Sequence, residues 1–154
     1  MVAQLFPLTL TQAETSRRGK RLVGPVDLSL DGRGLCVVMG PNGSGKTTLL
    51  RLMHGTARLT GGSVSWACDT ETARHNQAFV FQRPVVLRRT VEENLPYPLR
   101  LRGTARRAAR EPAQIWAARV GLAPRLGRRA MVLSGGAQPK LAIARPLLPH
   151  PPPL

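Results

Sequence analysis

A glycine-rich segment in the first third of the chain constrains the fold more than any other feature. It follows the apolar run Leu35–Met39, which predicts a strand buried on both faces, and it precedes the helical spacing of Thr47–His54. Glycines let the backbone fold tightly and point successive N–H groups inward as a nest for an anion. The arrangement therefore predicts a strand, a phosphate-binding loop and a helix, in the pattern GxxxxGK[ST]. The segment reads Gly40, Pro41, Asn42, Gly43, Ser44, Gly45, Lys46, Thr47, followed by Thr48.

Each residue type in this segment suits a nucleoside triphosphate. The ammonium of Lys46 can reach the β- and γ-phosphates, and the hydroxyl of Thr47 suits Mg²⁺ coordination. The positive dipole end of the helix that begins near Gly45 adds to the attraction. The alternative is a structural glycine turn with a chance lysine, and the strand and helix on either side argue against it. We expect residues 40–48 to bind ATP and Mg²⁺.

A second glycine motif, Leu133-Ser134-Gly135-Gly136-Ala137-Gln138, precedes a predicted helix over Gln138–Arg145. Following a phosphate loop, it closely resembles the LSGGQ signature of ATP-binding cassette (ABC) proteins. The resemblance implies that Ser134, Gly135 and Gly136 contact the γ-phosphate of ATP held by the phosphate loop of a partner subunit, in a homo- or heterodimer. The underlying chemistry is again an anion at a helix start.

Gln82 is the third candidate site residue. It ends a predicted apolar strand, Ala78–Phe81, where the resemblance places the Q-loop glutamine that reaches toward Mg²⁺ and the attacking water. A glutamine at a strand end is by itself usually only solvated. The resemblance thus implies Thr47 and Gln82 as Mg²⁺ ligands, and the phrase from Phe81 to Asn94 is similar to the prokaryotic importer branch.

The resemblance implies an α/β fold, a P-loop NTPase domain of the ABC type with a mixed or parallel sheet core and a helical subdomain. It covers nearly the whole chain as one domain that is incomplete at the C-terminus. We expect the core to span 1–82, the helical subdomain 83–132, and the signature motif with its helix 133–145. Residues 146–154 form a proline-rich tail that should be neither helix nor central strand.

Local patterns predict the remaining elements. Residues 2–10 are typical of an edge strand and residues 11–20 of a polar loop. Val26–Leu30 and Ser63–Trp66 alternate with period two and predict half-buried strands. Residues 90–121 are rich in helix formers and strongly cationic, with Pro112 placed where a helix can start.

The chain departs from the family pattern in its catalytic residues. Family members carry an Asp-Glu pair on a strand after the signature, but the last acidic residue of this chain is Glu111. The family's switch histidine also has no counterpart, since His150 comes too early and lies among prolines. Residues 10–22 contain no aromatic side chain to stack on adenine. We therefore expect ATP binding without a catalytic glutamate, and we interpret the change at Arg145-Pro146 as a truncation or a reading-frame shift.

Composition leaves alternatives open. Lys and Arg number 23 against 8 Asp and Glu, for a net charge of +15, which favours an anionic partner such as nucleic acid. The leading hypothesis is the ATP-binding subunit of an ABC membrane transporter, partnered with a transmembrane permease, without specific nucleic acid, and peripheral on the cytoplasmic face of the membrane. The alternatives are a soluble ABC-type ATPase acting on nucleic acid and a non-functional fragment.

Overall fold

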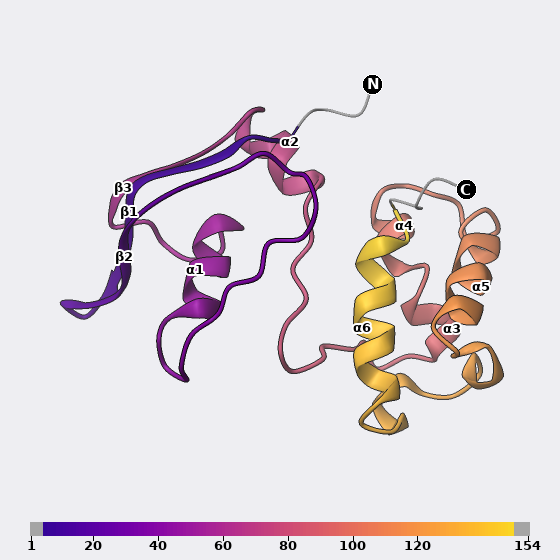
Figure 1. Cartoon of the computed structure of the whole chain (residues 1–154). Coiled ribbons are helices and arrows are strands. Elements are labelled where there is room, and N and C mark those ends of the chain that lie inside the picture. Colours follow the sequence, from indigo (N-terminus) through magenta and orange to yellow (C-terminus); the bar gives the residue numbers. More distant parts are fainter. Residues whose placement is uncertain (1–4, 150–154) are drawn as a thin grey trace. The chain divides into compact units, whose positions relative to one another are not determined.

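The chain divides between two units of different secondary structure, Met1–Ala78 and Phe79–Leu154 (Figure 1). We call them the sheet unit and the helical unit. The computed structural model describes residues 5–149. The expected boundary between core and helical subdomain, after Gln82, falls shortly beyond the division between the units.

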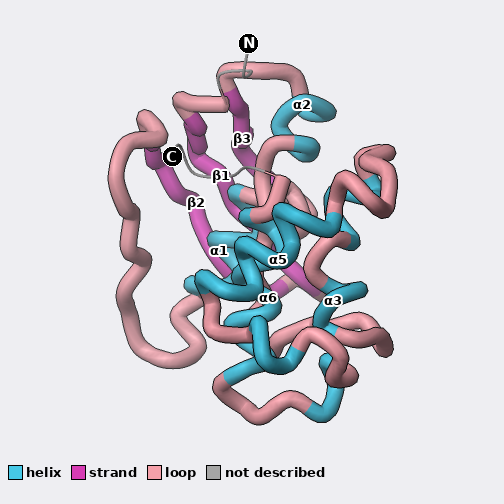
Figure 2. Tube along the Cα trace, turned by 90° about the vertical axis from the view of Figure 1, so that its right-hand side faces the viewer, coloured by secondary structure: helices cyan, strands magenta, loops and turns pink. Residues whose placement is uncertain are grey.

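The sheet unit is built on three antiparallel strands in the order β2-β1-β3 (Figure 2). They are β1 (Leu8–Arg17), β2 (Lys20–Leu30) and β3 (Gly61–Trp66). The predicted strands Val26–Leu30 and Ser63–Trp66 are confirmed, and both show the alternating burial that a period-two pattern predicts.

Two predictions about the segment that forms β1 were wrong. Strand β1 pairs with β2 on one side and β3 on the other, so it is the central strand of the described sheet and not an edge strand. It also continues to Arg17 through most of the segment predicted as a loop; residues 2–4 of the expected strand lie outside the described residues. A register shift after Leu10, with Gln12 at φ 47°, moves the buried positions from 8 and 10 to 13 and 15. This bulge hides the period-two pattern in the sequence.

Helix α1 (Lys46–Met53) packs on the sheet and confirms the helix predicted after the glycine-rich segment. Its Leu52 joins Leu8, Leu10 and Ala13 in a buried cluster. A short helix, α2 (Thr70–His75), follows β3 and begins at Asp69, whose carboxylate accepts a hydrogen bond from the Thr72 amide at 2.9 Å. The sheet unit thus anchors α1, and with it the loop that precedes α1.

The two predicted apolar strands Leu35–Met39 and Ala78–Phe81 are wrong as strands in this structure. Leu35 and Met39 are 89% and 86% exposed, and Phe81 is half exposed. A strand buried on both faces needs a neighbour at each edge and a layer on each face. No strand pairs with residues 35–39 among the described residues, and the described sheet is antiparallel throughout.

The helical unit contains four α-helices among its described residues: α3 (Val91–Asn94), α4 (Tyr97–Leu101), α5 (Arg110–Arg119) and α6 (Ala137–Leu147). Two short 3₁₀ turns, η1 (Ala123–Arg125) and η2 (Ala130–Val132), connect α5 to α6. The predicted helical character of residues 90–121 is confirmed, although Pro96 and Gly103 divide it into three helices. Pro112 lies within the first turn of α5, where the missing N–H costs little.

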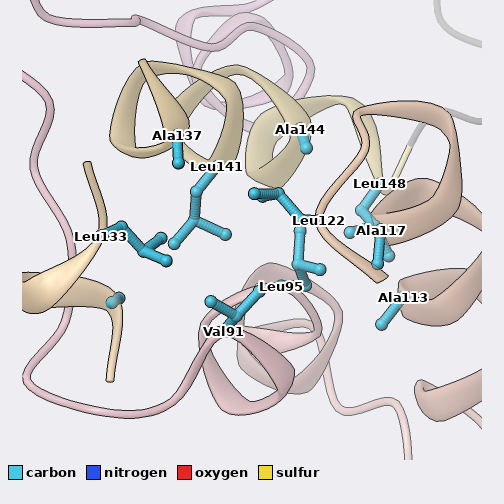
Figure 3. Close-up of a cluster of buried hydrophobic side chains, with 11 residues drawn as sticks. Val91, Leu95, Ala113, Ala117, Leu122, Leu133, Ala137, Leu141, Ala144 and Leu148 are labelled. Carbon is cyan, nitrogen blue, oxygen red and sulfur yellow. The ribbon is translucent and has the colours of Figure 1, made fainter. Parts of the chain in front are cut away.

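Small and branched apolar side chains from α3, α5, α6 and the adjoining turns fill the core of this unit (Figure 3). Helix α6 supplies Ala137, Leu141, Ala144 and Leu148 at spacings of four and three residues, which place them on one face. The other buried members come from α3, α5 and the turns: Val91, Leu95, Ala113, Ala117, Leu122, Ala130 and Leu133.

The end of α6 corrects the expectation of a non-helical tail. The helix continues through Pro146 to Leu147, two residues beyond the predicted end, and residues 150–154 of the expected tail lie outside the described residues. Proline has no amide to bond the Ala142 carbonyl, so the last turn has one hydrogen bond fewer than an uninterrupted helix. Leu148, only 2% exposed, joins the core directly after it, which stabilises the helical direction of the turn.

Candidate functional site

The glycine-rich loop leads into α1 and owes its shape to three glycines. Gly40, Gly43 and Gly45 have φ of 151°, 82° and 89°, values that residues with a Cβ rarely adopt. The Ser44 amide donates to the Pro41 carbonyl at 3.3 Å and closes a turn inside the loop. The loop is mostly exposed, so its backbone groups are open to a ligand.

Gly45 is fixed by a close approach as well as by its φ. A Cβ at this position would lie 2.5 Å from Val23 Cγ2 and 2.8 Å from the Leu22 carbonyl oxygen. Both atoms belong to β2, so the sheet sets the point at which α1 begins. Only glycine lets the helix start this close to the strand.

The ammonium of Lys46 lies folded over the loop. Its Nζ donates hydrogen bonds to the carbonyl oxygens of Gly40 and Pro41, at 2.8 and 2.7 Å. A cation is thereby held at the loop that the sequence predicted to bind phosphate, and it also closes the loop across its base. Two charge-assisted bonds of this kind keep the lysine side chain in place.

The N-terminus of α1 is open to an anion. Its N-cap, Gly45, has no side chain to bond the orphan amides, and no acidic residue lies in the first turn. The Thr47 side chain is exposed and that of Thr48 half-buried. The free amides and the helix dipole therefore point a partial positive charge at the loop.

The signature-like motif of the helical unit starts α6 in a different way. The Ser134 carbonyl accepts hydrogen bonds from the amides of Ala137 and Gln138, at 2.9 and 3.2 Å. Leu133 and Ala137 on either side are buried in the core. Ser134, Gly135 and Gly136 are exposed, and the Ser134 hydroxyl does not cap the helix.

The fold does not require glycine at 135 or 136. A Cβ at either position would meet nothing within 4 Å, and Gly136 has an ordinary helical φ of −82°. What the two glycines provide is an exposed backbone that a ligand can approach without a side chain in the way.

Gln82 lies exposed in a bend at the start of the helical unit. It therefore belongs to the same unit as Ser134–Gly136, while residues 40–48 belong to the sheet unit. Within the described residues, no group of three or more His, Cys, Asp or Glu side chains is placed to hold a metal ion.

Sequence reasoning missed Asn94, which organises the segment after Gln82. This side chain is fully buried; its Oδ1 accepts from the Leu87 amide at 2.8 Å, and its Nδ2 donates to the carbonyls of Leu87, Arg89 and Thr90. The Thr-x-x-Glu spacing of Thr90 and Glu93 signals the adjoining helix start, because it is the pattern of a capping box.

The capping box also lowers the pKa of the Glu93 carboxyl group. The amide and hydroxyl of Thr90 donate to the Glu93 carboxylate and lower its pKa, with a smaller contribution from nearby arginines.

Arg145 of α6 links the segment around residue 85 to the signature helix. Its Nη1 donates to the Val85 carbonyl at 2.8 Å, and burial lowers the pKa of its guanidinium.

Comparison with known proteins identifies the family. The sequence profile of the ABC transporter family matches residues 23–154, which include both glycine motifs. The chain belongs to the ABC transporter family. The resemblance carried by residues 40–48 and 133–138 is thereby confirmed at the level of the family, and the helical and strand elements described above belong to an ABC-type P-loop domain.

Relatives of this ABC family member include the tungstate uptake system ATP-binding protein TupC of Peptoclostridium acidaminophilum, 30% identical over 141 residues. The lipoprotein-releasing system ATP-binding protein LolD of Hahella chejuensis is 37% identical over 137 residues. The alignments cover 91% and 82% of this chain but 66% and 59% of those relatives. The chain thus spans less than two thirds of their length.

A solved structure supports the fold. The cbiO1 protein of Clostridium perfringens, part of the ABC transporter complex cbiONQ, superposes with a TM-score of 0.77 over 94% of this chain and 62% of its own. The two sequences are 17% identical, so this likeness concerns the fold alone. No helix among residues 5–149 is long and apolar enough to cross a membrane.

Proposed function

We propose that the chain binds ATP with Mg²⁺ through residues 40–48 and acts as the ATP-binding subunit of a membrane transporter. The observation that carries the proposal is the loop before α1, in which three positive-φ glycines, an uncapped helix start and the Lys46 ammonium converge. These groups supply amide donors and positive charge where a triphosphate needs them. Matches to ATP-binding subunits of transport systems support the same function.

Binding would proceed by replacing contacts that the loop now makes with itself. Lys46 bonds two loop carbonyls, and these bonds give way to the β- and γ-phosphates when a nucleotide enters. The hydroxyl of Thr47 and the amide oxygen of Gln82 are hard oxygen donors of the kind that Mg²⁺ prefers. When bound, the metal would neutralise phosphate charge.

Dimerisation would give the second motif its role. The exposed backbone at Gly135 and Gly136, with the unused hydroxyl of Ser134, would contact the γ-phosphate of ATP bound to a second ATP-binding subunit. The dimer would couple to a transmembrane permease at the cytoplasmic face of the membrane. Matches to transporter subunits support this reading over an ATPase that acts on nucleic acid.

Hydrolysis by the 154-residue polypeptide alone is not part of the proposal. None of residues 112–154 is Asp or Glu, so this stretch offers no carboxylate to polarise water or to hold Mg²⁺. Groups that orient the attacking water and hold Mg²⁺ supply much of the catalysis of phosphoryl transfer, so we expect no ATP turnover by this polypeptide on its own. ATP turnover abolished by Lys46→Ala would contradict this expectation.

The test of binding is a calorimetric titration of the chain with ATP and Mg²⁺. Lys46→Ala should weaken binding at least about tenfold, because it removes a charge-assisted contact with phosphate. Lys20→Ala is the matched control: it removes the same charge from the exposed start of β2 in the same unit, and it should bind like the wild type. Equal weakening in both variants would reduce the effect to net charge and refute the proposal.

A further inference from the structure

A cavity of about 720 Å³ is lined only by residues of the helical unit, which come from α3, α4, the start of α5 and the segments beside them. Its volume is within the range of roughly 300–1,000 Å³ typical of small-molecule sites. Part of the lining is apolar, from Pro96, Ala113 and Leu126, and Thr90 and Gln114 add polar groups. Six charged side chains complete the lining: Arg100, Arg106, Arg107, Arg110, Glu92 and Glu93.

The two carboxylates are already engaged by the chain itself. Glu92 pairs with Arg110, whose Nε lies 3.6 Å from its Oε1. Glu93 accepts from the amide and the hydroxyl of Thr90 in the capping box, at 3.2 and 3.1 Å. The first contact links α3 to α5, and the second stays within the start of α3.

The remaining three arginines make no close ion pair within residues 5–149. Arg106 interacts with Glu93 only through a weaker electrostatic attraction, and Arg100, Arg106 and Arg107 are all exposed. Like charges repel one another, yet these three arginines line the same cavity as Arg110. The cavity therefore presents an excess of guanidinium donors to whatever enters it.

Guanidinium groups select the chemistry of the ligand. Their planar forks match phosphate oxygens in bidentate geometry, and a cluster of three or four can share the charge of a diphosphate. The apolar part of the lining suits a ligand with a non-ionic part as well. We propose that this cavity is a second anion site, which binds a soluble phosphorylated small molecule and is built only from the helical unit.

The experiment must separate this site from the loop at residues 40–48. The probe is inorganic pyrophosphate, titrated calorimetrically into the Lys46→Ala chain at about 50 mM salt, where screening is weak. The proposal predicts binding of one pyrophosphate per chain. Adding Arg106→Gln and Arg107→Gln should weaken that binding about a hundredfold, because each removes a charge-assisted contact worth about tenfold.

Two further double variants serve as controls. Arg83→Gln with Arg88→Gln removes the same charge from exposed positions of the same unit that do not line the cavity, and binding should stay within about twofold. Arg106→Lys with Arg107→Lys keeps the charge but loses the fork, so its affinity should fall between those of the wild type and the glutamine pair.

Several results would overturn the proposal. One is the absence of pyrophosphate binding in the Lys46→Ala chain. Another is equal weakening by the cavity pair and the control pair, which would reduce the effect to net charge. A third is loss of binding to phosphatidate vesicles in the cavity pair with pyrophosphate binding unchanged, which would assign the arginines to a lipid surface.

Discussion

Helices α1 and α6 each begin after a glycine-rich loop with a glycine at the N-cap, yet the two loops depend on glycine for different reasons. Gly45 has a φ of 89° and lies against the backbone of β2. Gly136 has a φ of −82° and open space where a Cβ would be. The fold itself demands the first glycine, whereas only an incoming ligand would demand the second.

The hydrophobic cores of the two units differ in size. Among the described residues, the cluster under the sheet has four buried members, and the cluster in the helical unit has eleven. The loop at residues 133–138 therefore stands on the larger core, while the loop at residues 40–48 depends on a smaller core and on its contact with β2. The predictions below test this difference from the largest expected effect to the smallest.

The largest effect is expected at the centre of the helical core. Leu141→Ala should lower the free energy of unfolding by about 3 kcal/mol, because Leu141 is fully buried and the change leaves a cavity. Leu147→Ala on the same helix is the control, since Leu147 is 41% exposed and should cost much less. Denaturant unfolding followed by circular dichroism measures both; similar losses would show that the helical core is not the support described.

The next largest effect is expected from substitution of the N-cap glycine of α1, compared with that of α6. Gly45→Ala should cost about 2 kcal/mol, because the variant must hold a left-handed conformation and its Cβ meets Val23 and Leu22. Gly136→Ala should stay within about 0.5 kcal/mol. Thermal melts without nucleotide measure the contrast. If Gly136→Ala were the more damaging variant, the distinction between the two loops would be wrong.

A smaller effect is expected at the capping box. Thr90→Ala removes the hydroxyl that accepts from the Glu93 amide and should cost about 1 kcal/mol. Thr90→Ser keeps the hydroxyl and should restore most of the stability. A denaturant titration of the three proteins in parallel provides the measurement, and an unchanged midpoint in Thr90→Ala would mean that the cap contributes nothing.

The smallest effect is a pH dependence. The folded-state pKa of Glu93 lies below its ordinary value because Thr90 donates to the carboxylate. Its contribution to stability is therefore present above the ordinary pKa and is lost as the pH falls through the folded-state pKa. Melting temperatures of the wild type and Glu93→Gln should converge across this acid range, and parallel curves would contradict the expectation.

Local chemistry made much of this fold predictable. The loop at residues 40–48, helix α1 and strand β3 follow from glycine placement and apolar periodicity within a few residues of each element. Strand β1 was not predictable in this way, because the bulge at Gln12 shifts the alternation by one residue. Residues 35–39 were wrongly predicted to form a buried strand. A continuous apolar run shows that the residues can be buried, but it does not show whether neighbouring strands are present to pair with them.

In the candidate site, too, local geometry was predictable from the sequence and tertiary contacts were not. Residue type and spacing indicated Lys46 and the three positive-φ glycines, whose geometry is local. The role of Asn94 depends on carbonyls brought together by a turn, and the arginine cavity depends on how α3, α4 and α5 pack. Neither follows from periodicity, because both are properties of tertiary contact.

One measurement tests the central claim most directly: titration of a fluorescent ATP analogue with Mg²⁺ into dilute Lys46→Ala and Ser134→Ala. Lys46 lies in the loop that we propose holds the nucleotide of its own chain, and Ser134 lies in the loop that we propose serves a partner. The account predicts that Lys46→Ala loses binding while Ser134→Ala binds like the wild type. The opposite pattern, or equal loss in both, would contradict it.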